Sequence, residues 1–429
     1  MPSTKKYDKN FIYTIFYFPN SYSQKLIKYT KKGDECPILL KSNKNTETHL
    51  KKEMEKQFTQ LKKVKDTQLK NQKENPKKAY DVEQVISGFT RGVSRHFNQH
   101  YQSSKNRGVS NAFIKAWEVY STFPFYFKKS KNQKIKSFHF AEMPGQFINS
   151  LASYINSNFN KTLDWNAESL NPKNPINIKK YGNELFDDKY GLYKDYKNNW
   201  KFGKKDGQGN GLESKDTGDI TDFGILSYFR EYNRGIWHPE IITADAGLNS
   251  DMMETAHLQK LELAQAIATI SSSSLGGDVI VKHFGPFDPT KPKTKKAGEQ
   301  FMGLIYLYYL YFSKIYLYKP LSSSNVSAEF YVIGLGLNKE MKTEDFQDLC
   351  SKMTNLKENE LYIKMDEMPT LFKGQVLKFL EELNNINKEG LENQNYLYQF
   401  WDEFKEQTNG CLKTLQEEKM ETWLKLYMF

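Results

Sequence analysis

The chain has 429 residues, enough for one large α/β domain with extensions or for two to three domains of average size. Its formal net charge is +11, and lysines crowd the first eighty residues. A basic chain with 27 tyrosines and 29 phenylalanines suits a nucleic-acid partner, because phosphates pair with cations and bases stack on aromatic rings. An AT-rich genome would give the same composition without such a partner.

The cysteine pattern and the hydropathy exclude other classes of protein. Cys36, Cys350 and Cys411 are far apart and form no CxxC pair, which argues against a disulfide framework and a structural zinc site and indicates a reducing, intracellular compartment. The N-terminus is polar and lysine-rich, unlike a signal peptide. The most apolar segment, residues 302–312, is too short to span a bilayer, so we expect no membrane partner.

Residues 1–80 are expected to form a basic N-terminal extension. An apolar run over residues 11–18 is typical of a strand. Further along, apolar residues recur at helical spacing among lysines and predict one amphipathic helix. These residues are Leu50, Met54, Phe58, Leu61, Val64 and Leu69. Such a helix either docks on the main domain, binds a partner or lies along RNA.

Residues 81–337 alternate between helical and strand patterns, which predicts a doubly wound, mainly parallel α/β sheet. Helices are expected at 112–127, 146–156, 223–232, 251–274 and 296–312. Strands are expected at 135–141 and 163–167, in two segments ending at Asp245 and Lys282, and at 314–319 and 329–335. The last two are joined by a loop too short for a helical crossover, so they should be antiparallel.

Two other regions complete the expected organisation. Residues 171–218 are polar and rich in Asn, Lys, Gly and Asp, and we expect surface loops there. Residues 338–429 carry no strand pattern and are expected to form a C-terminal helical region. Its helices are predicted at 343–356, 369–388 and 394–427.

Two of the predicted strands are apolar runs that end in a charged residue. One leads from Ile241 to Asp245, and the next leads from Val279 to Lys282. Buried parallel strands have this pattern, with functional groups where the chain leaves the sheet. A buried ammonium is unfavourable without a partner, so Lys282 is expected to pair with Asp245. A structural salt bridge and a catalytic pair are both compatible with this contact.

Two turns could approach a nucleotide-like ligand. A predicted strand, a Pro-Gly turn and a helix start meet in Glu142-Met143-Pro144-Gly145-Gln146-Phe147. A second turn, at residues 218–221, carries Asp219 and Ile220. Asp219 is placed either to accept hydrogen bonds from an adenine amino group or a ribose, or to cap a helix.

Taken together, these motifs resemble the FtsJ-type (RrmJ-like) 2′-O-ribose methyltransferases, particularly the cap-directed enzymes of eukaryotes and of large DNA viruses. The resemblance covers about residues 90–337 and rests on segments 110–115, 142–147, 218–221, 243–247, 276–282, 319–320 and 327–332. It implies a Rossmann-like seven-stranded sheet with an antiparallel last strand. It also implies a catalytic Lys-Asp-Lys-Glu tetrad at Lys115, Asp245, Lys282 and Glu329.

The resemblance implies S-adenosylmethionine as the cofactor. Its site would comprise Glu142, Met143, Pro144, Gly145, Gln146, Phe147, Asp219, Ile220 and Asp245. Glu142 is expected to accept a hydrogen bond from the ammonium group of the cofactor. The first turn of family members is commonly richer in glycine, and here Met143 and Gln146 stand at two of the small positions. Their larger side chains predict a more crowded contact with the methionine moiety.

The implied reaction is methyl transfer to a ribose 2′-hydroxyl of RNA. Lys282 is expected to hold or deprotonate the hydroxyl; burial and Lys115 would lower its pKa, whereas Asp245 and Glu329 would raise it. The polar insertion at residues 171–218 and the extensions at residues 1–80 and 338–429 favour the cap region of mRNA as the substrate. Other capping or transcription proteins are then expected as partners, and the cytoplasm or nucleus as the location. The alternatives are a methyltransferase of ribosomal or transfer RNA, and an inactive RNA-binding subunit that keeps the fold.

Overall fold

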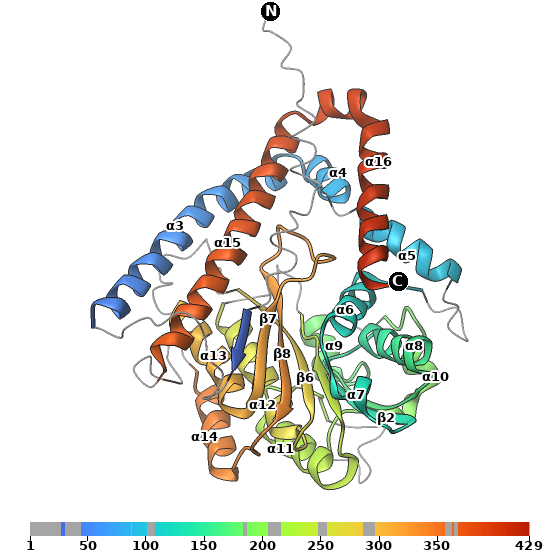
Figure 1. The fold of residues 1–429 in the computed structure, drawn as a ribbon, viewed down its shortest axis with the longest axis vertical. Coiled ribbons are helices and arrows are strands. Elements are labelled where there is room, and N and C mark those ends of the chain that lie inside the picture. Colours follow the sequence, from blue (N-terminus) through green and yellow to red (C-terminus); the bar gives the residue numbers. More distant parts are fainter. Residues whose placement is uncertain are drawn as a thin grey trace, which may run out of the picture.

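The computed structural model describes residues 27–30, 44–86, 88–100, 108–182, 187–204, 216–247, 255–285, 297–356, 363 and 368–428. A twisted sheet lies at the centre with helices on both faces, and long helices extend beyond one end of it (Figure 1). The strand expected at residues 11–18 lies outside the described residues. No helix in the described ranges is both long enough and apolar enough to cross a lipid bilayer.

The sheet confirms the predicted α/β topology. Within the described residues it has eight strands in the order β1-β7-β8-β6-β5-β2-β3-β4. The strands are β1 Ile27–Thr30, β2 Lys134–Phe140, β3 Thr162–Glu168, β4 Trp200–Lys201, β5 Ile241–Ala244, β6 Asp278–Phe284, β7 Phe312–Tyr318 and β8 Glu329–Leu337. Strands β2 to β6 pair in parallel, whereas β8 is antiparallel to both β6 and β7. Strand β1 extends the expected seven strands as an antiparallel edge beside β7.

Both faces of the central strands are buried, which explains their uninterrupted apolar sequence. In β6, Val279 and Val281 join one hydrophobic cluster, while Ile280 between them joins another. The first cluster includes helices α11 Phe223–Tyr232, α12 Thr255–Ser272 and α13 Ala297–Tyr311. The second includes α6 Asn111–Thr122 and α8 Gln146–Phe159. The sheet therefore holds its strand ends rigidly, and functional side chains there have fixed positions.

The helix expected over residues 112–127 is divided in two. Helix α6 ends at Thr122, and the short helix α7 Tyr126–Lys129 follows. Phe123 precedes Pro124 and is extended, with φ −102° and ψ 147°. The proline ring disfavours a helical conformation at the residue before it, so the break has a local cause.

The polar segment at residues 171–218 was expected to be surface loops, and its described part is more ordered than that. It contains helices α9 Pro175–Tyr181 and α10 Leu192–Asp195 as well as edge strand β4. Trp200 and Phe202 are fully buried, and Trp200 packs edge-on against Trp165 of β3. Isolated aromatic anchors therefore fix this segment to the sheet, although the residues around them are polar.

The terminal helices pack together and against the domain. Helix α3 Lys44–Glu74 runs alongside α15 Thr370–Gln399 (Figure 1). The Asn71 amide donates to Asn395 Oδ1 at 2.9 Å, so α3 docks on α15. Helix α15 continues through residues 388–394, where a break was predicted. Its first turns join the hydrophobic cluster that contains α11, α12 and α13. The remaining helices are α4 Pro76–Ile86, α5 Phe89–His100, α14 Thr343–Thr354 and α16 Trp401–Tyr427.

Candidate active site

The sheet topology brings the four residues of the expected tetrad to one rim. Asp245 follows β5 directly, and Lys282 lies near the end of β6. Because β8 is antiparallel to β6, its first residue, Glu329, lies at the same rim. Lys115 reaches this rim from helix α6. Residues distant in the sequence therefore meet at the carboxyl ends of the parallel strands, where α/β proteins bind ligands.

The four side chains form two ion pairs. Lys282 Nζ lies 2.9 Å from Asp245 Oδ1 and also donates to the Asp245 backbone oxygen at 3.0 Å. Lys115 Nζ lies 2.7 Å from Glu329 Oε1. The side chains are between 9% and 19% exposed, so they are nearly buried but reachable from solvent. The expected pairing of Lys282 with Asp245 is present, and Lys115 and Glu329 lie next to it.

The neighbouring carboxylates of the tetrad keep Lys282 in its charged form. Burial alone would lower the pKa of Lys282, but the Asp245 and Glu329 carboxylates outweigh it and raise the pKa above its ordinary value. Burial would likewise raise the pKa of Glu329, yet the neighbouring lysines together lower it to about 2. At neutral pH the resting site therefore contains an ammonium on Lys282 and a carboxylate on Glu329.

Lys319 is a third lysine beside the tetrad, and sequence reasoning used it only as part of a motif. Burial lowers its pKa to about 7. Its Nζ donates to Ser323 Oγ at 2.8 Å, Ser324 O at 2.9 Å and Ser327 O at 2.7 Å. Ser323 Oγ in turn donates to Glu329 Oε1 at 3.0 Å. Lys319 thus closes the β7–β8 loop, residues 320–328, on itself and helps to hold the Glu329 carboxylate.

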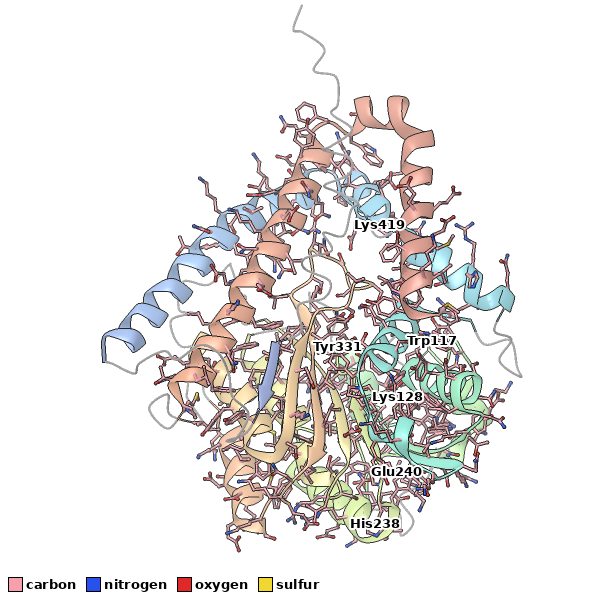
Figure 2. All side chains as sticks on the ribbon, in the orientation of Figure 1. Trp117, Lys128, His238, Glu240, Tyr331 and Lys419 are labelled. Atoms are coloured by element: carbon pink, nitrogen blue, oxygen red, sulfur yellow. The ribbon has the colours of Figure 1, made fainter. Side chains whose placement is uncertain are left out.

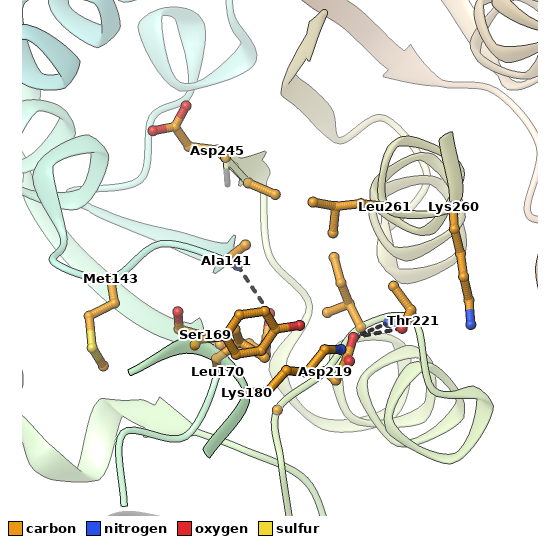
Figure 3. Close-up of a pocket in the computed structure, with 16 residues that line it drawn as sticks. Ala141, Met143, Ser169, Leu170, Lys180, Asp219, Thr221, Asp245, Lys260 and Leu261 are labelled. Carbon is orange, nitrogen blue, oxygen red and sulfur yellow. Dashed lines mark hydrogen bonds between the residues drawn. The ribbon is translucent and has the colours of Figure 1, made fainter. Parts of the chain in front are cut away.

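A pocket of about 540 Å³ has Asp245 in its lining (Figure 3). The Asp245 carboxylate is the partner of Lys282. The walls of the pocket come from the turn after β2, the end of β3, helix α9, the turn before α11, the segment after β5 and helix α12. The residues that line it are Ala141, Met143, Glu168, Ser169, Leu170, Lys180, Tyr181, Gly218, Asp219, Ile220, Thr221, Asp245, Ala246, Gly247, Lys260 and Leu261.

Some of the predicted cofactor residues line this pocket, and others support it from outside. Met143, Asp219, Ile220 and Asp245 are in its lining, whereas Glu142, Pro144, Gly145, Gln146 and Phe147 are not. Glu142 Oε1 accepts hydrogen bonds from the backbone amides of Phe147, at 2.8 Å, and Ile148, at 3.3 Å. That carboxylate therefore caps the N-terminus of α8, while its Oε2 atom is buried without a hydrogen-bond partner.

The two larger residues of the first turn do not fill the pocket. Gln146 is buried outside the lining, and its Oε1 accepts a hydrogen bond from the Ser110 amide at 3.1 Å. Met143 packs against a small hydrophobic cluster that contains Trp165 and Leu192. The segment at residues 171–218 and the start of α6 thus contact these side chains, but Met143 also lines the pocket, and crowding of the methionine moiety stays a prediction.

Glu168 is a pocket residue that sequence reasoning missed. It is the last residue of β3, one position beyond the predicted end of that strand. Its Oε2 accepts a hydrogen bond from the Ala141 amide at 3.0 Å, while Oε1 is buried without a partner. Burial raises the pKa of Glu168 well above its ordinary value. A buried carboxyl oxygen without a partner, on a residue that lines the pocket, suits the hydroxyl groups of a ribose in the nucleoside part of S-adenosylmethionine.

Hydrogen bonds within the turn before α11 hold the Asp219 side chain. Its Oδ1 accepts hydrogen bonds from Thr221 N at 2.9 Å and Thr221 Oγ1 at 2.7 Å. The N-cap of α11 is Asp222 instead, since its side chain accepts from the Ile225 amide. Gly218 has φ +67°, and a Cβ there would overlap the Ser169 carbonyl oxygen, so only glycine permits this close approach.

The insertion contributes Lys180 and Tyr181 to the pocket, which its polar sequence did not indicate. Lys180 Nζ lies 4.8 Å from the centre of the Tyr181 ring. At the base of α9, the buried Asn177 amide donates to Asn171 O at 3.0 Å and Thr217 O at 2.7 Å. Buried asparagines thus connect α9 to the turn that carries Asp219.

Comparison with known proteins gives consistent matches. The profile of a family described as FtsJ-like methyltransferase matches residues 109–337. "Uncharacterized protein L511" of Acanthamoeba polyphaga mimivirus is 27% identical over 249 residues, covering 57% of this chain and 28% of that protein. "Probable methyltransferase EP424R" of African swine fever virus (isolate Pig/Kenya/KEN-50/1950) is 27% identical over 273 residues, covering 61% of this chain and 56% of that protein.

A cellular relative is also similar. "Cap-specific mRNA (nucleoside-2'-O-)-methyltransferase 2" of Mus musculus is 25% identical over 249 residues, covering 57% of this chain and 29% of that protein. The chain spans less than two thirds of the length of each of these relatives. The residues that the family profile matches, 109–337, contain strands β2 to β8 and all four residues of the tetrad.

Proposed function

Because the chain belongs to the FtsJ-like methyltransferase family, we propose that it transfers a methyl group from S-adenosylmethionine to a ribose 2′-hydroxyl of RNA. The observation that carries the proposal is the Lys282–Asp245 pair at the mouth of the pocket, with Lys115 and Glu329 beside it. An acceptor oxygen that contacts Lys282 would lie next to any ligand in that pocket.

The residues of the pocket suit the proposed cofactor. Glu168 and Asp219 would contact its nucleoside part, because both carboxylates line the pocket and Glu168 Oε1 has no partner of its own. Bound there, S-adenosylmethionine would supply an electrophilic methyl group. Tyr181 would close the open side of the pocket with its ring.

The tetrad would orient the acceptor hydroxyl. The Lys282 ammonium donates a hydrogen bond to the hydroxyl oxygen, and the Asp245 carboxylate, 2.9 Å from that ammonium, is near enough to receive the released proton. Lys282 itself is a poor base while its pKa is raised by Asp245 and Glu329. Positioning of the oxygen and exclusion of water would then supply most of the rate acceleration.

The proposed substrate is the 5′ cap region of mRNA. A relative with a quarter of its aligned residues identical is named as a cap-specific mRNA methyltransferase, and the chain carries a net charge of +11 that favours an RNA partner. The intact tetrad favours catalysis over an inactive binding role, since four charged side chains are held at a nearly buried rim.

The deciding experiment is a methyl-transfer assay with labelled S-adenosylmethionine. Capped RNA, the same RNA without a cap and a structured ribosomal RNA fragment are compared, and nuclease digestion identifies the labelled nucleotide. We expect label on the 2′-oxygen of a nucleotide next to the cap, and little on the other two substrates. Label on a base, or transfer to the ribosomal fragment alone, would contradict the proposal. Calorimetry with the cofactor separates a lack of binding from a lack of transfer.

A further inference from the structure

The β7–β8 loop leads directly into Glu329, and helices from outside the sheet hold it on two sides. One side is helix α6, where Glu118 lies one turn beyond Lys115 and is completely buried. The Glu118 carboxylate accepts hydrogen bonds from the loop amides of Leu321, at 2.6 Å, and Ser322, at 3.0 Å. The helix that carries one member of the tetrad thus also fixes the loop that precedes another.

Helix α16 joins this network through its last turns. Trp423 Nε1 donates to Glu118 Oε2 at 2.9 Å, and its ring is almost completely buried. Trp117, labelled in Figure 2 on helix α6, donates from Nε1 to the Tyr427 carbonyl at 3.1 Å. Ser121 Oγ donates to the same oxygen at 3.3 Å. The C-terminal helix therefore packs on α6 and shares its buried carboxylate with the loop.

Helix α15 holds the other side of the loop. The Asn387 amide, with its nitrogen directed at the loop, donates to Asn325 O at 2.7 Å and to Ser327 O at 2.8 Å. Gly390 lies against Asn325 so closely that a Cβ there would be 2.9 Å from its carbonyl carbon. Asn387 is buried, so loss of its amide would leave the Asn325 carbonyl without this donor, whereas Ser327 O would keep its hydrogen bond from Lys319 Nζ.

We propose that α15 and α16 form a positioning element of the methyl-transfer centre, in which Asn387 and Trp423 fix the β7–β8 loop and keep Glu329 on Lys115. The C-terminal region would then act on the methyl-transfer centre through these two residues instead of forming a separate appendage. Neither Asn387 nor Trp423 lines the pocket, so both would act through the loop. The activity readout of this inference rests on the proposed function.

The test compares two variants with a matched control. Trp423→Phe removes the donor to Glu118 but keeps an aromatic ring, and Asn387→Leu removes both bonds to the loop. Asn395→Leu is the control, because Asn395 also makes two hydrogen bonds from α15, to Asn71 and to the Val64 carbonyl, but none to the loop. We expect kcat to fall about tenfold or more in the first two variants, since small misplacements of catalytic groups have effects of this size. KM for S-adenosylmethionine should stay unchanged, and the control should retain the wild-type kcat.

Hydrogen exchange provides a second readout that does not need activity. The amides of Leu321 and Ser322 should exchange faster in Trp423→Phe than in wild type and in Asn395→Leu. Wild-type kcat in both variants, or an equal fall in the control, would overturn the inference. If the wild-type protein methylates no RNA, the proposed function fails, and hydrogen exchange alone tests the positioning role. Unchanged exchange of the Leu321 and Ser322 amides in Trp423→Phe would then overturn that role.

Discussion

The Lys115 ammonium lies 2.7 Å from the Glu329 carboxylate, and this pair joins helix α6 to the first residue of strand β8. It is adjacent to the second pair, Lys282 with Asp245, so that two lysines and two carboxylates compensate one another at a nearly buried rim. Removing one member leaves its partner charged and poorly solvated. Variants of this centre therefore need a measurement of stability beside the measurement of activity.

The first prediction concerns the lysine at the mouth of the pocket. Lys282→Ala removes the group that holds the acceptor oxygen, so we expect kcat to fall by about a hundredfold or more, the range typical of groups that act directly on the reacting atoms. Cofactor affinity measured by calorimetry should change little. Lys314→Ala, at an exposed position on β7, should behave as wild type. Near-normal turnover of Lys282→Ala with an unchanged melting temperature would show that its assigned role is wrong.

The second prediction uses the glycine beside that lysine. A Cβ at Gly247 would lie 3.0 Å from Lys282 Nζ, closer than an ordinary contact. In Gly247→Ala the ammonium must move, so kcat should fall about tenfold or more. Gly235→Ala is the matched control, because a Cβ there meets no atom within 4 Å. Equal kcat values for the two variants would indicate that the position of Lys282 is not critical.

The third prediction tests the pocket itself. Glu168→Gln keeps an oxygen for the Ala141 amide but replaces the unpaired Oε1 by a donor. A ribose hydroxyl would lose its acceptor oxygen, so the Kd for S-adenosylmethionine should rise about tenfold, as expected for the loss of one hydrogen bond. Glu231→Gln, at an exposed position on α11, should leave the Kd unchanged. The same Kd in both variants would place the nucleoside elsewhere.

The fourth prediction concerns pH and stability. Glu262 accepts a hydrogen bond from the Phe284 amide at 2.8 Å, and burial raises its pKa to about 8. A carboxyl whose pKa is raised by folding stabilises the protein below its unfolded pKa of about 4.5, and this contribution disappears as the pH rises through about 8. The unfolding free energy of wild type should therefore decline relative to Glu262→Gln between these pH values. Urea titrations of both proteins across this range measure the difference, and parallel curves would contradict the prediction.

Much of the sheet and the Asp245–Lys282 pair could be predicted because both leave strong local signals, whereas Lys115 and Glu329 were implied only by the family resemblance. Apolar β-branched runs identify buried strands, and a charged residue at the end of such a run is unfavourable without a partner. That reasoning found Asp245 and Lys282. The Pro124 boundary of α6 could have been found from the same sequence, since the residue before a proline avoids helix.

Other parts of the site gave no local signal. Glu168 ends a short strand in which apolar and polar residues are mixed. Lys180 and Tyr181 belong to the segment at residues 171–218, whose buried anchors are isolated aromatic residues. The hydrogen bond between Glu118 and Trp423 joins residues that are 305 positions apart in the sequence. Neither position belongs to a periodic pattern that would predict this contact. Such contacts depend on tertiary packing, which a single sequence does not display.

Strand β8 lies between β6 and β7, both of which precede it in the chain. During synthesis, a polypeptide that has reached only β7 contains Lys115, Asp245 and Lys282 but lacks the carboxylate of Glu329. Strand β8 must pair with both β6 and β7 before Lys115 gains Glu329 as its partner. Under the proposed function, the four-residue centre would therefore be complete only when β8 joins the sheet.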